Sequence, residues 1–452
     1  ICLLCACQNS KSASEERLLE YIPEYSKDIA IIGLPDFLPC PSGWTETSFD
    51  AGSGYVIPYC EPPEFDPHNP TITAQAPNPP NFLPCPEGWT EVEDETTGVV
   101  TCSPYGPEGP LECDSIDEAH FPGEPGCVRI GTECPVGDWA ENLPEDRDVY
   151  YVKAGGDAFG DGSMENPFGS INEAIASVGT DAVLALSKGI FDEVVAIPTG
   201  IVLWGACVAE TLVTSTVPSE TEAVITARDP NAEVRNLQIS GQRLGVEVRG
   251  QFAQLHIQDV LIRGASSAGI HVYSGRLSID SLFLRDTQAR PSDGAWGRGL
   301  HVQDGSEVEV IRTVLQNNRE LGVSAFHEGT TLRLEDVVVR DTLSQQSDGK
   351  WGRGLHVQDG SEVEVIRTVF QNNRDVGVSA IHEGTTVRLE DVVVRDTLSR
   401  QNDGRTGRGL LVQDGSELEV IRTVFQNNRE IGVISFDEGT TLRLEDVVVR
   451  DT

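Results

Sequence analysis

Three short loops carry the side chains best suited to binding chemistry. Residues 293–296, 348–351 and 403–406 read DGAW, DGKW and DGRT, each 55 positions after the one before. An indole offers an apolar face to a sugar ring, and a neighbouring carboxylate accepts hydrogen bonds from its hydroxyls. The loops therefore predict glycan binding, with the structural alternative that each Trp only covers the flank of the fold. The candidate residues are Asp293, Trp296, Asp348, Trp351 and Asp403, and Thr406 stands where the third Trp would be.

Histidines recur at two positions of the same pattern. His271, His301 and His356 share one strand position, and Leu411 occupies it in the last copy. A second position holds His327 and His382, followed by Asp437. Neutral imidazoles are common metal ligands, but solvated or hydrogen-bonded surface histidines are the favoured interpretation.

A glycine-rich loop contains the candidate cation ligands Asp157 and Asp161. Carboxylates and backbone carbonyls are the ligands that Ca²⁺ prefers. The alternative is a tight turn, since Asp and Gly both favour turns. No cofactor is required by the sequence, and Ca²⁺ is the one candidate.

A repeat of 55 residues positions the loops. The phrase GRGLHVQDGSEVEVIRTV begins at Gly297 and returns at Gly352, and it begins again at Gly407 with two changes to Leu. The first copy holds two shorter units, which start at Gly299 and Gly322. Degenerate earlier units start at Gly245 and Gly269. Stretches of alternating apolar residues, separated by Gly and polar pairs, predict coils of about 23 residues with three short strands each. This pattern is typical of a parallel β-helix, an all-β solenoid.

Charged residues alternate between successive units. Aligning the units places Glu309 beside Arg333 and Arg312 beside Asp336, and the later copies continue both series. Neighbouring strands lie about 4.8 Å apart, so two outward ladders of alternating sign are expected, with a structural role. The recurring Asn317, Asn372 and Asn427 predict a buried or turn-bound stack of amides.

Composition narrows the classes of partner. The net charge of −39 excludes a basic footprint for nucleic acid. It fits a soluble, self-repelling surface that attracts cations. A hydrophobic content of 38% with 6% aromatic residues suits a solenoid with a thin aliphatic core. A chain of 452 residues has room for two or three domains.

The N-terminal residues predict export and a lipid anchor. Residues 1–7 read ICLLCAC and resemble the end of a bacterial lipoprotein signal peptide, with Cys7 as the lipidated residue. A cut-down ordinary signal peptide is the alternative. Residues 8–34 are then a polar tether. Gln8 follows the cysteine where Asp would favour inner-membrane retention in similar enteric lipoproteins, so we expect the outer membrane or cell surface. The lipid is the only expected contact with a membrane.

Residues 35–147 form a loop-rich segment with its own repeat. PDFLPCPSGWTE from Pro35 matches PNFLPCPEGWTE from Pro80. The two copies predict the disulfides Cys40–Cys60 and Cys85–Cys102. Four further cysteines are expected in disulfides, namely Cys113, Cys127, Cys134 and Cys207, with Cys207 paired to Cys134 or Cys127. A zinc site is disfavoured because no two of these eight cysteines show paired C-x₂-C spacing.

Residues 148–452 are the predicted β-helix, with the 55-residue repeats from about residue 297. A short helix over 171–178, N-capped by Ser170 with Glu173 as its capping-box partner, is expected to close the first coil. From Tyr151 the pattern Y-V-x(2)-G-x-D-x(2)-G-D-G-S-x(2)-N-P-F-x-S-I-x-E-A-I resembles the opening of right-handed parallel β-helix proteins of the pectate-lyase-like superfamily. The lipoprotein-like signal sequence at residues 1–7, the Cys-rich segment and the β-helix together resemble surface lipoproteins of myxobacteria-like organisms.

The resemblance is specific for fold and leaves the activity open, because the superfamily includes lyases, hydrolases, epimerases and non-catalytic surface proteins. Candidate residues here occur two or three times, whereas an active site is one constellation. The favoured hypothesis is therefore a non-catalytic surface lipoprotein that acts in adhesion or glycan binding, with a polysaccharide as partner. The alternative is a polysaccharide lyase or hydrolase for acidic glycans, with its groove on the degenerate coils between Gly245 and Arg285.

Overall fold

The structure, a computed structural model, describes residues 45–50, 56–61, 79–106, 109–157 and 159–452. The chain divides into two compact units, residues 1–77 and 78–452, and each is described by itself. The predicted lipidation of Cys7, the predicted segments 1–7 and 8–34, and the predicted Cys40–Cys60 disulfide lie outside the described residues or their side chains. In the first unit, β1 (Thr45–Asp50) pairs antiparallel with β2 (Val56–Glu61).

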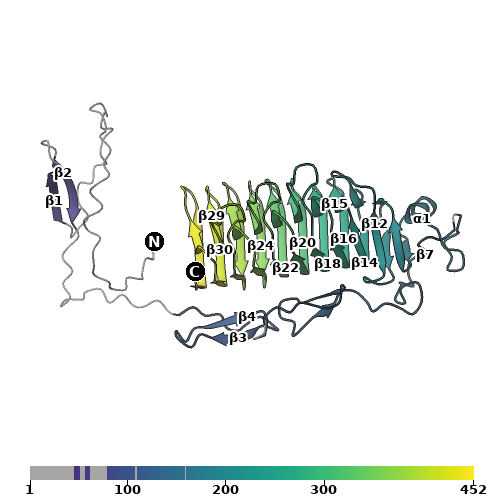
Figure 1. The fold of residues 1–452 in the computed structure, drawn as a ribbon, viewed down its shortest axis with the longest axis horizontal. Helices are drawn as coiled ribbons and strands as arrows, with labels where there is room; N and C mark the ends of the chain where they lie inside the picture. Colours follow the sequence, from purple (N-terminus) through teal and green to yellow (C-terminus); the bar gives the residue numbers. More distant parts are fainter. Residues whose placement is uncertain (1–44, 51–55, 62–78, 107–108, 158) are drawn as a thin grey trace, which may run out of the picture. The chain divides into compact units, whose positions relative to one another are not determined.

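The second unit is a parallel β-solenoid in which each coil contributes a short and a long strand (Figure 1). The short strands pair in chain order as β10 (Val195–Ile197), β13 (Ala223–Ala227), β15 (Leu244–Arg249), β17 (Ala268–Tyr273), β19 (Arg298–Gln303), β21 (Leu321–Phe326), β23 (Arg353–Gln358), β26 (Val376–Ile381), β29 (Arg408–Gln413) and β31 (Ile431–Ser435). The long strands are β14 (Ala232–Gly241), β16 (Gln254–Arg263), β18 (Arg276–Arg285), β20 (Glu307–Gln316), β22 (Thr331–Arg340), β30 (Glu417–Gln426) and β32 (Thr441–Arg450).

Some coils have their long strand divided in two. These pieces are β24 (Glu362–Ile366) with β25 (Val369–Gln371), and β27 (Thr386–Glu390) with β28 (Val393–Arg395). The first coils contain β7 (Val149–Val152), β8 (Val183–Leu186), β9 (Gly189–Asp192), β11 (Val202–Gly205) and β12 (Thr211–Ser215).

Left-handed residues bend the long strands, so the two sheets make three faces. Arg312 in β20 has φ of 50° and Asp336 in β22 has φ of 54°. A single residue in this region redirects the chain while the pairing on both sides continues. The prediction of three short strands per coil is corrected accordingly, since two of them are the halves of one bent strand in most coils. The short strands form the loop face, the first halves of the long strands the ladder face, and their second halves the strap face.

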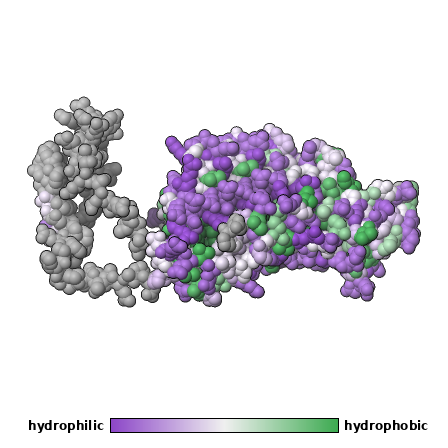
Figure 2. Space-filling view, turned by 60° about the horizontal axis from the view of Figure 1, so that its bottom comes forward, coloured by the Kyte–Doolittle hydropathy of each residue, from purple (hydrophilic) through white to green (hydrophobic). Residues whose placement is uncertain are grey.

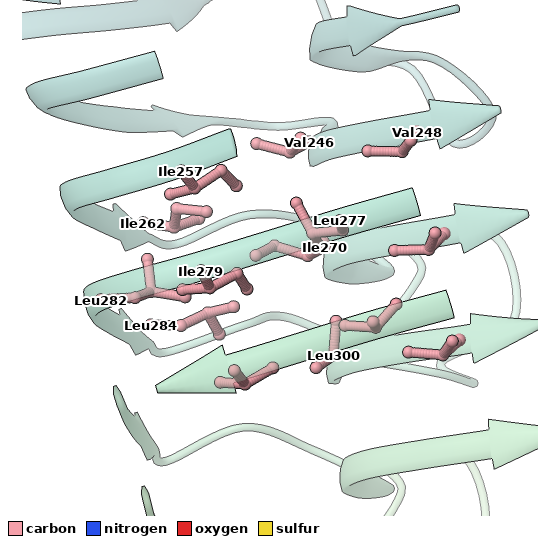
Figure 3. Close-up of a cluster of buried hydrophobic side chains, with 14 of the residues drawn as sticks. Val246, Val248, Ile257, Ile262, Ile270, Leu277, Ile279, Leu282, Leu284 and Leu300 are labelled. Carbon is pink, nitrogen blue, oxygen red and sulfur yellow. The ribbon is translucent and has the colours of Figure 1, made fainter. Parts of the chain in front are cut away.

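Aliphatic side chains fill the interior in stacks (Figure 3). Val246, Ile270 and Leu300 lie on neighbouring short strands and are all buried. Burial of each such side chain stabilises the fold by about 1.5–3 kcal/mol before chain entropy is counted. The glycines that open the predicted units are needed for close packing, since a Cβ on Gly299 would lie 2.4 Å from the carbonyl oxygen of Gly322.

The predicted helix closes the first coil as α1 (Ile171–Ser177). The Ser170 hydroxyl accepts a hydrogen bond from the Glu173 N–H at 3.1 Å. Glu173 itself accepts from the N–H groups of Gly169 and Phe159. In the simplest capping box it would accept from the N–H of the N-cap residue Ser170, one residue after Gly169. Glu193 accepts from the Ile171 N–H at 2.8 Å.

The cysteine-rich residues 79–106 and 109–142 lie along the strap face and are called the strap (Figure 1). The strap contains two antiparallel pairs, β3 (Thr90–Glu93) with β4 (Val100–Ser103) and β5 (Glu118–Ala119) with β6 (Val128–Arg129). It passes from the last coil toward the first: the Asn81 N–H donates to Asp446, and the Thr132 N–H donates to Asn236. Figure 2 brings the lower side of Figure 1 forward and shows hydrophobic patches within a mainly hydrophilic surface.

The strap buries a line of outward-pointing apolar side chains. Phe82 and Trp89 pack against Val393 and Val424 near the last coils. Farther along, the strap residues Tyr105, Ala119, Phe121 and Ile130 pack against Leu261, Phe283, Val314, Val338 and Val369. The sheet of the strap face therefore has apolar side chains on its inner and its outer side. The strap covers the outer ones.

Three disulfides hold the second unit. The predicted Cys85–Cys102 bond is present, and Cys113 is bonded to Cys127. Cys207, for which two partners were open, is bonded to Cys134 and joins the strap to the first coils. Among the described residues, no helix is both long and apolar enough to cross a membrane.

Candidate functional site

The three predicted loops project from the loop face and stack on one another. They precede β19, β23 and β29, which lie in the same sheet. The Ser347 N–H donates to the Gly294 carbonyl at 2.9 Å. The Gln401 and Asn402 N–H groups both donate to Gly349 at 3.1 Å. These contacts fix each loop relative to the next, so the repeat in sequence becomes a regular row in space.

The candidate aspartates shape their own loops. Asp293 accepts from the Ala295 N–H at 2.9 Å, and the corresponding bonds join Asp348 to Lys350 and Asp403 to Arg405. A hydrogen bond from Arg290, together with that from Ala295, lowers the pKa of Asp293 to about 2. All three carboxylates remain exposed. Asp293 is therefore ionised at neutral pH, and all three carboxylates can be reached by a ligand.

The two tryptophans are half-buried and lie over arginines. The guanidinium carbon of Arg298 is 4.2 Å from the ring centroid of Trp296, and that of Arg353 is 4.3 Å from the ring of Trp351. Contact over an indole ring is a favourable cation–π geometry. Each Trp thus covers the flank of its coil, as the structural alternative expected. The uncovered part of each ring keeps the glycan-binding hypothesis a prediction.

Behind each Trp lies an ion pair that the sequence did not single out. Arg298 binds Glu320 at 3.0 Å, and Arg353 binds Asp375 at 3.0 Å. The third copy has the same pair, Arg408 with Glu430 at 2.9 Å, but Thr406 covers it less. The Arg408 side chain is 24% exposed, against 11% for Arg298 and 13% for Arg353. The recurring G-R-G with an acid 22 residues later was the signal in the sequence.

The first histidine series lies in one column, as predicted, but it is buried and not solvated. His301 and His356 are each 1% exposed, because the loops and Trp side chains lie against them. Their Nδ1 atoms lie 2.8 Å from the hydroxyls of Ser324 and Ser379. Burial and the adjacent arginines hold the pKa of both imidazoles well below its usual value. They are therefore neutral and part of the packing.

The second histidine series lies on the exposed turns. His327 Nδ1 is 2.9 Å from Asp304, and His382 Nδ1 is 2.5 Å from Asp359. Asp437 follows in the last copy. These pairs are the hydrogen-bonded surface histidines that were expected at this position.

A column of outward residues beside the buried histidines was missed. In successive strands the column contains Tyr273, Gln303, Phe326, Gln358, Ile381 and Gln413. Tyr273 is 38% exposed and the ring of Phe326 lies edge-on to His301. Amides and aromatic faces are common in sugar sites. Alternation of side chains along each strand, two residues after the histidine, was the available signal.

A separate charged cluster lies on the degenerate coils. Glu247 is 4% exposed, and its carboxylate is 3.3 Å from Arg249 and 4.0 Å from the Nδ1 of His271. Burial, with the charges of Arg249 and Arg298, lowers the pKa of His271 to about 4. Arg249 also lies over the ring of Tyr273 at 5.1 Å.

The predicted charge ladders are present on the ladder face and have a structural role. Arg333 lies opposite Glu309 and binds Glu335 and Glu364. Burial alone would raise the pKa of Glu335, but hydrogen bonds from Arg367 and Arg333 lower it. One partner differs from expectation, because Arg312 binds Glu124 of the strap at 2.7 Å.

The expected amide stack is divided between two adjacent positions. Asn317 occupies a turn with φ of 54° and donates to Asp286. The fully buried amide is the next residue, Asn318, which accepts from the Thr287 hydroxyl at 2.7 Å. Asn373 and Asn428 are buried in the same way in the later copies. The predicted asparagines are therefore turn-bound, and the buried amides are the residues that follow them.

The cation candidates Asp157 and Asp161 are exposed, and Asp161 accepts from the Ser163 N–H at 2.9 Å as in a tight turn. Within the described residues, the one group of ligand-type side chains close enough to hold a metal is Cys134, Cys207 and Glu210. Its two cysteines are consumed by their disulfide. The Ca²⁺ hypothesis stays a prediction.

Comparison with known proteins identifies the fold. Residues 222–394 match the family model described as right handed beta helix region. The solenoid is a right-handed parallel β-helix. The crystal structure of pectate lyase Pel9A is 13% identical, with a TM-score of 0.51, over 69% of this chain and 81% of that chain. No curated protein matches the sequence.

Two further solved structures resemble the β-helix more distantly. A rhamnogalacturonan lyase is 10% identical, with a TM-score of 0.37, over 66% of this chain and 86% of that chain. A pectin methylesterase from carrot is 12% identical, with a TM-score of 0.30, over 69% and 85%. At 13% identity, the likeness to the pectate lyase shows the fold alone.

Proposed function

We propose that the chain is a non-catalytic, surface-anchored β-helix lipoprotein that binds glycans through its loop face. The observation that carries this proposal is the repetition of Trp296 and Trp351 in the same half-buried place, two coils apart. Two coils correspond to about 10 Å along the axis. Each Trp shares its loop with an exposed Asp, so the face offers apolar and polar contacts at regular intervals. This arrangement suits a polymer with repeating sugar units.

Repetition also favours binding over catalysis. General acid–base chemistry needs one converging set of groups with matched pKa values. On the loop face the candidate groups recur, and His301 and His356 are buried and hydrogen-bonded. Several weak contacts along one polymer add through effective concentration, which suits adhesion.

The cell-surface location is part of the same proposal. Cys7 in the LCAC sequence would hold the lipid, and the three disulfides of the second unit fit an oxidising compartment. Metabolic labelling with a fatty-acid analogue, compared between the parent and Cys7→Ser, tests the anchor. Label that persists in Cys7→Ser contradicts it.

A glycan array tests the binding function. The double variant Trp296→Ala, Trp351→Ala is expected to lose most of the signal, because a stacked aromatic contributes more than about 1.4 kcal/mol, or tenfold in affinity. Trp139→Ala is the matched control: Trp139 is also half-buried but contacts Tyr151. Circular dichroism confirms that each variant is folded. Unchanged array binding by the double variant contradicts the proposal.

The charged cluster on the degenerate coils supports the second candidate, a polysaccharide lyase or hydrolase for acidic glycans. The buried Glu247 lies 4.0 Å from His271, whose pKa is lowered to about 4, and perturbed groups are enriched at functional sites. A screen of uronate-containing glycans for unsaturated products, with and without Ca²⁺, separates the two functions. Cleavage that is lost in Glu247→Gln would replace the binding proposal with this one. Silence across the screen leaves binding as the function.

A further inference from the structure

A row of arginines lies at the base of the projecting loops, one coil after each loop. The row recurs every 55 residues and consists of Arg319, Arg374 and Arg429. The Arg319 N–H donates to the Gly297 carbonyl at 2.7 Å, and the same bond recurs in the second copy. Because Gly297 directly follows Trp296 in the chain, each of these arginines starts the coil that comes after a tryptophan.

The Arg319 side chain lies between one loop and the next. A Cβ on Gly297 would lie 2.6 Å from the Cβ of Arg319, and the guanidinium donates to the Ser344 carbonyl at 3.5 Å. Arg374 makes the corresponding bond to Ser399 at 3.0 Å. Both side chains are half-buried, and their unbonded nitrogens are not closed off from solvent. Each arginine therefore keeps donors that a ligand lying across the loops can reach.

The three arginines have no acidic partner, whereas the acids around them do. Among the described residues, no carboxylate forms an ion pair with any of the three. The acids that follow them in the chain are bonded to the arginines behind the loops. The exposed aspartates of the loops are also paired, as Arg290–Asp293, Lys350–Asp348 and Arg400–Asp403. The base of the loops therefore has an excess of positive charge, in a chain with a net charge of −39.

We propose that the glycan bound by the loop face has a carboxylate on every second sugar. Arg319 and Arg374 hold the carboxylates, and the sugars between them contact the uncovered parts of Trp296 and Trp351. This inference rests on the proposed glycan binding and adds the class of glycan. Like groups recur every two coils, or about 10 Å, which is about the length of a disaccharide in an extended glycan. Guanidinium groups bind carboxylates through charge-assisted hydrogen bonds. Salt limits repulsion by the distant acids to about 8 Å.

Calorimetric titration of the disulfide-intact full chain tests the class of glycan. The probes are a hyaluronan octasaccharide, with one carboxylate per disaccharide, and its methyl ester, with none. The acid is expected to bind at least about tenfold more tightly than the ester, because the ester lacks the charge-assisted bonds. An octagalacturonate, with a carboxylate on every sugar, is expected to bind more weakly than hyaluronan, since every second carboxylate then meets no arginine.

The double variant Arg319→Gln, Arg374→Gln locates the site. It should weaken binding of the acid at least about tenfold and leave binding of the ester within about twofold. The matched control is Arg228→Gln, Arg263→Gln, which removes two exposed arginines of the earlier coils and should change neither affinity by more than about twofold. Raising NaCl should weaken binding of the acid only.

The opposite results overturn the inference. Equal affinity for the acid and the ester, or for hyaluronan and octagalacturonate, contradicts the alternating class and leaves glycan binding in place. Equal weakening in the two double variants would assign the effect to net charge. No binding of hyaluronan by a chain that binds a neutral glycan on the array overturns this inference alone, whereas an empty array overturns the proposed function as well. If Arg319→Gln, Arg374→Gln does not fold, the comparison of acid and ester on the parent chain decides.

Discussion

The strap face and the loop face differ in the outward side chains they present and in what covers them. On the strap face, outward residues such as Val338 and Val369 are apolar and lie beneath another part of the chain. On the loop face, outward residues include imidazoles, amides and aromatic rings, and the tryptophans of short loops lie against the buried histidines. The strap face is closed along much of its length, whereas the loop face keeps Asp293 exposed and leaves Trp296 and Trp351 half-buried.

This difference in cover assigns stability to the strap face and recognition to the loop face. An outward apolar stripe must be covered, because exposed contiguous apolar surface promotes association. The strap does this with Phe82, Trp89, Tyr105 and Phe121 and is fixed by the Cys134–Cys207 disulfide. On the loop face, His301 and His356 are hydrogen-bonded to serine hydroxyls, and the aspartates of the loops are exposed. We therefore expect substitutions on the strap face to change folding and those on the loop face to change binding.

The largest effect is expected for Phe121→Ala. Phe121 is 1% exposed within the strap interface and lies under Arg312. Truncation of a buried Phe typically destabilises a protein by about 3–5 kcal/mol, through lost burial and the cavity that remains. Urea unfolding measures the effect. Phe252→Ala, at a position that is 72% exposed, is the control and should change stability by less than about 0.5 kcal/mol. Equal, small effects in both variants would show that the strap does not stabilise the solenoid.

A smaller effect is expected from acidification. The pKa of His271 is lowered to about 4 in the folded chain, so the unfolded chain binds the proton first as pH falls from 7. The stability it contributes is complete above pH about 6.5 and is lost toward pH 4. At pH 5 the loss from His271 alone is about 2 kcal/mol. His301 and His356 shift in the same direction.

Urea unfolding at pH 7 and pH 5 checks this dependence. His271→Gln should flatten the profile between these pH values, before most carboxylates titrate. A profile equally steep in the parent and in His271→Gln would show that the imidazole is not shielded as the structure places it.

Restoring the missing indole should stabilise the third copy slightly. Thr406→Trp places a ring where Trp296 and Trp351 cover Arg298 and Arg353. Cation–π contact with Arg408 is expected to add about 0.5–1 kcal/mol. Thr406→Leu supplies apolar bulk without the ring and is the control. A gain of the same size from Leu would assign the effect to burial alone.

The smallest effect is expected on the ladder face. Arg333→Ala removes ion pairs with Glu309, Glu335 and Glu364, whose side chains are partly exposed. Such pairs contribute about 0.2–1 kcal/mol each, and salt weakens them. The loss of stability should therefore shrink when NaCl is raised. A loss that does not change with salt would point to packing of the arginine stem instead.

Much of the fold could be predicted because the same residue pattern recurs in each copy of the repeat. The coil starts at Gly299 and Gly322, the Glu309–Arg333 register, the Ser170 cap and the Cys85–Cys102 bond all follow from local spacing. Each of these depends on residues that are close in the sequence or that lie in adjacent coils.

The strap could not be predicted in the same way. Its contacts join residues hundreds of positions apart, such as Asn81 and Asp446, and leave no periodic pattern. One signal was present: runs such as Val337-Val338-Val339 break the alternation of a strand and leave Val338 pointing outward. The burial of His301 was missed because it comes from the loop that covers the strand, and the strand pattern alone does not show that loop.

The most direct test of the division between the two faces is the affinity of one array-identified glycan for two variants. We predict that Trp296→Ala, Trp351→Ala binds at least about tenfold more weakly, while Arg340→Gln on the strap face binds as the parent does. Equal affinity in the parent and the double tryptophan variant, with both folded, would contradict the assignment of recognition to the loop face.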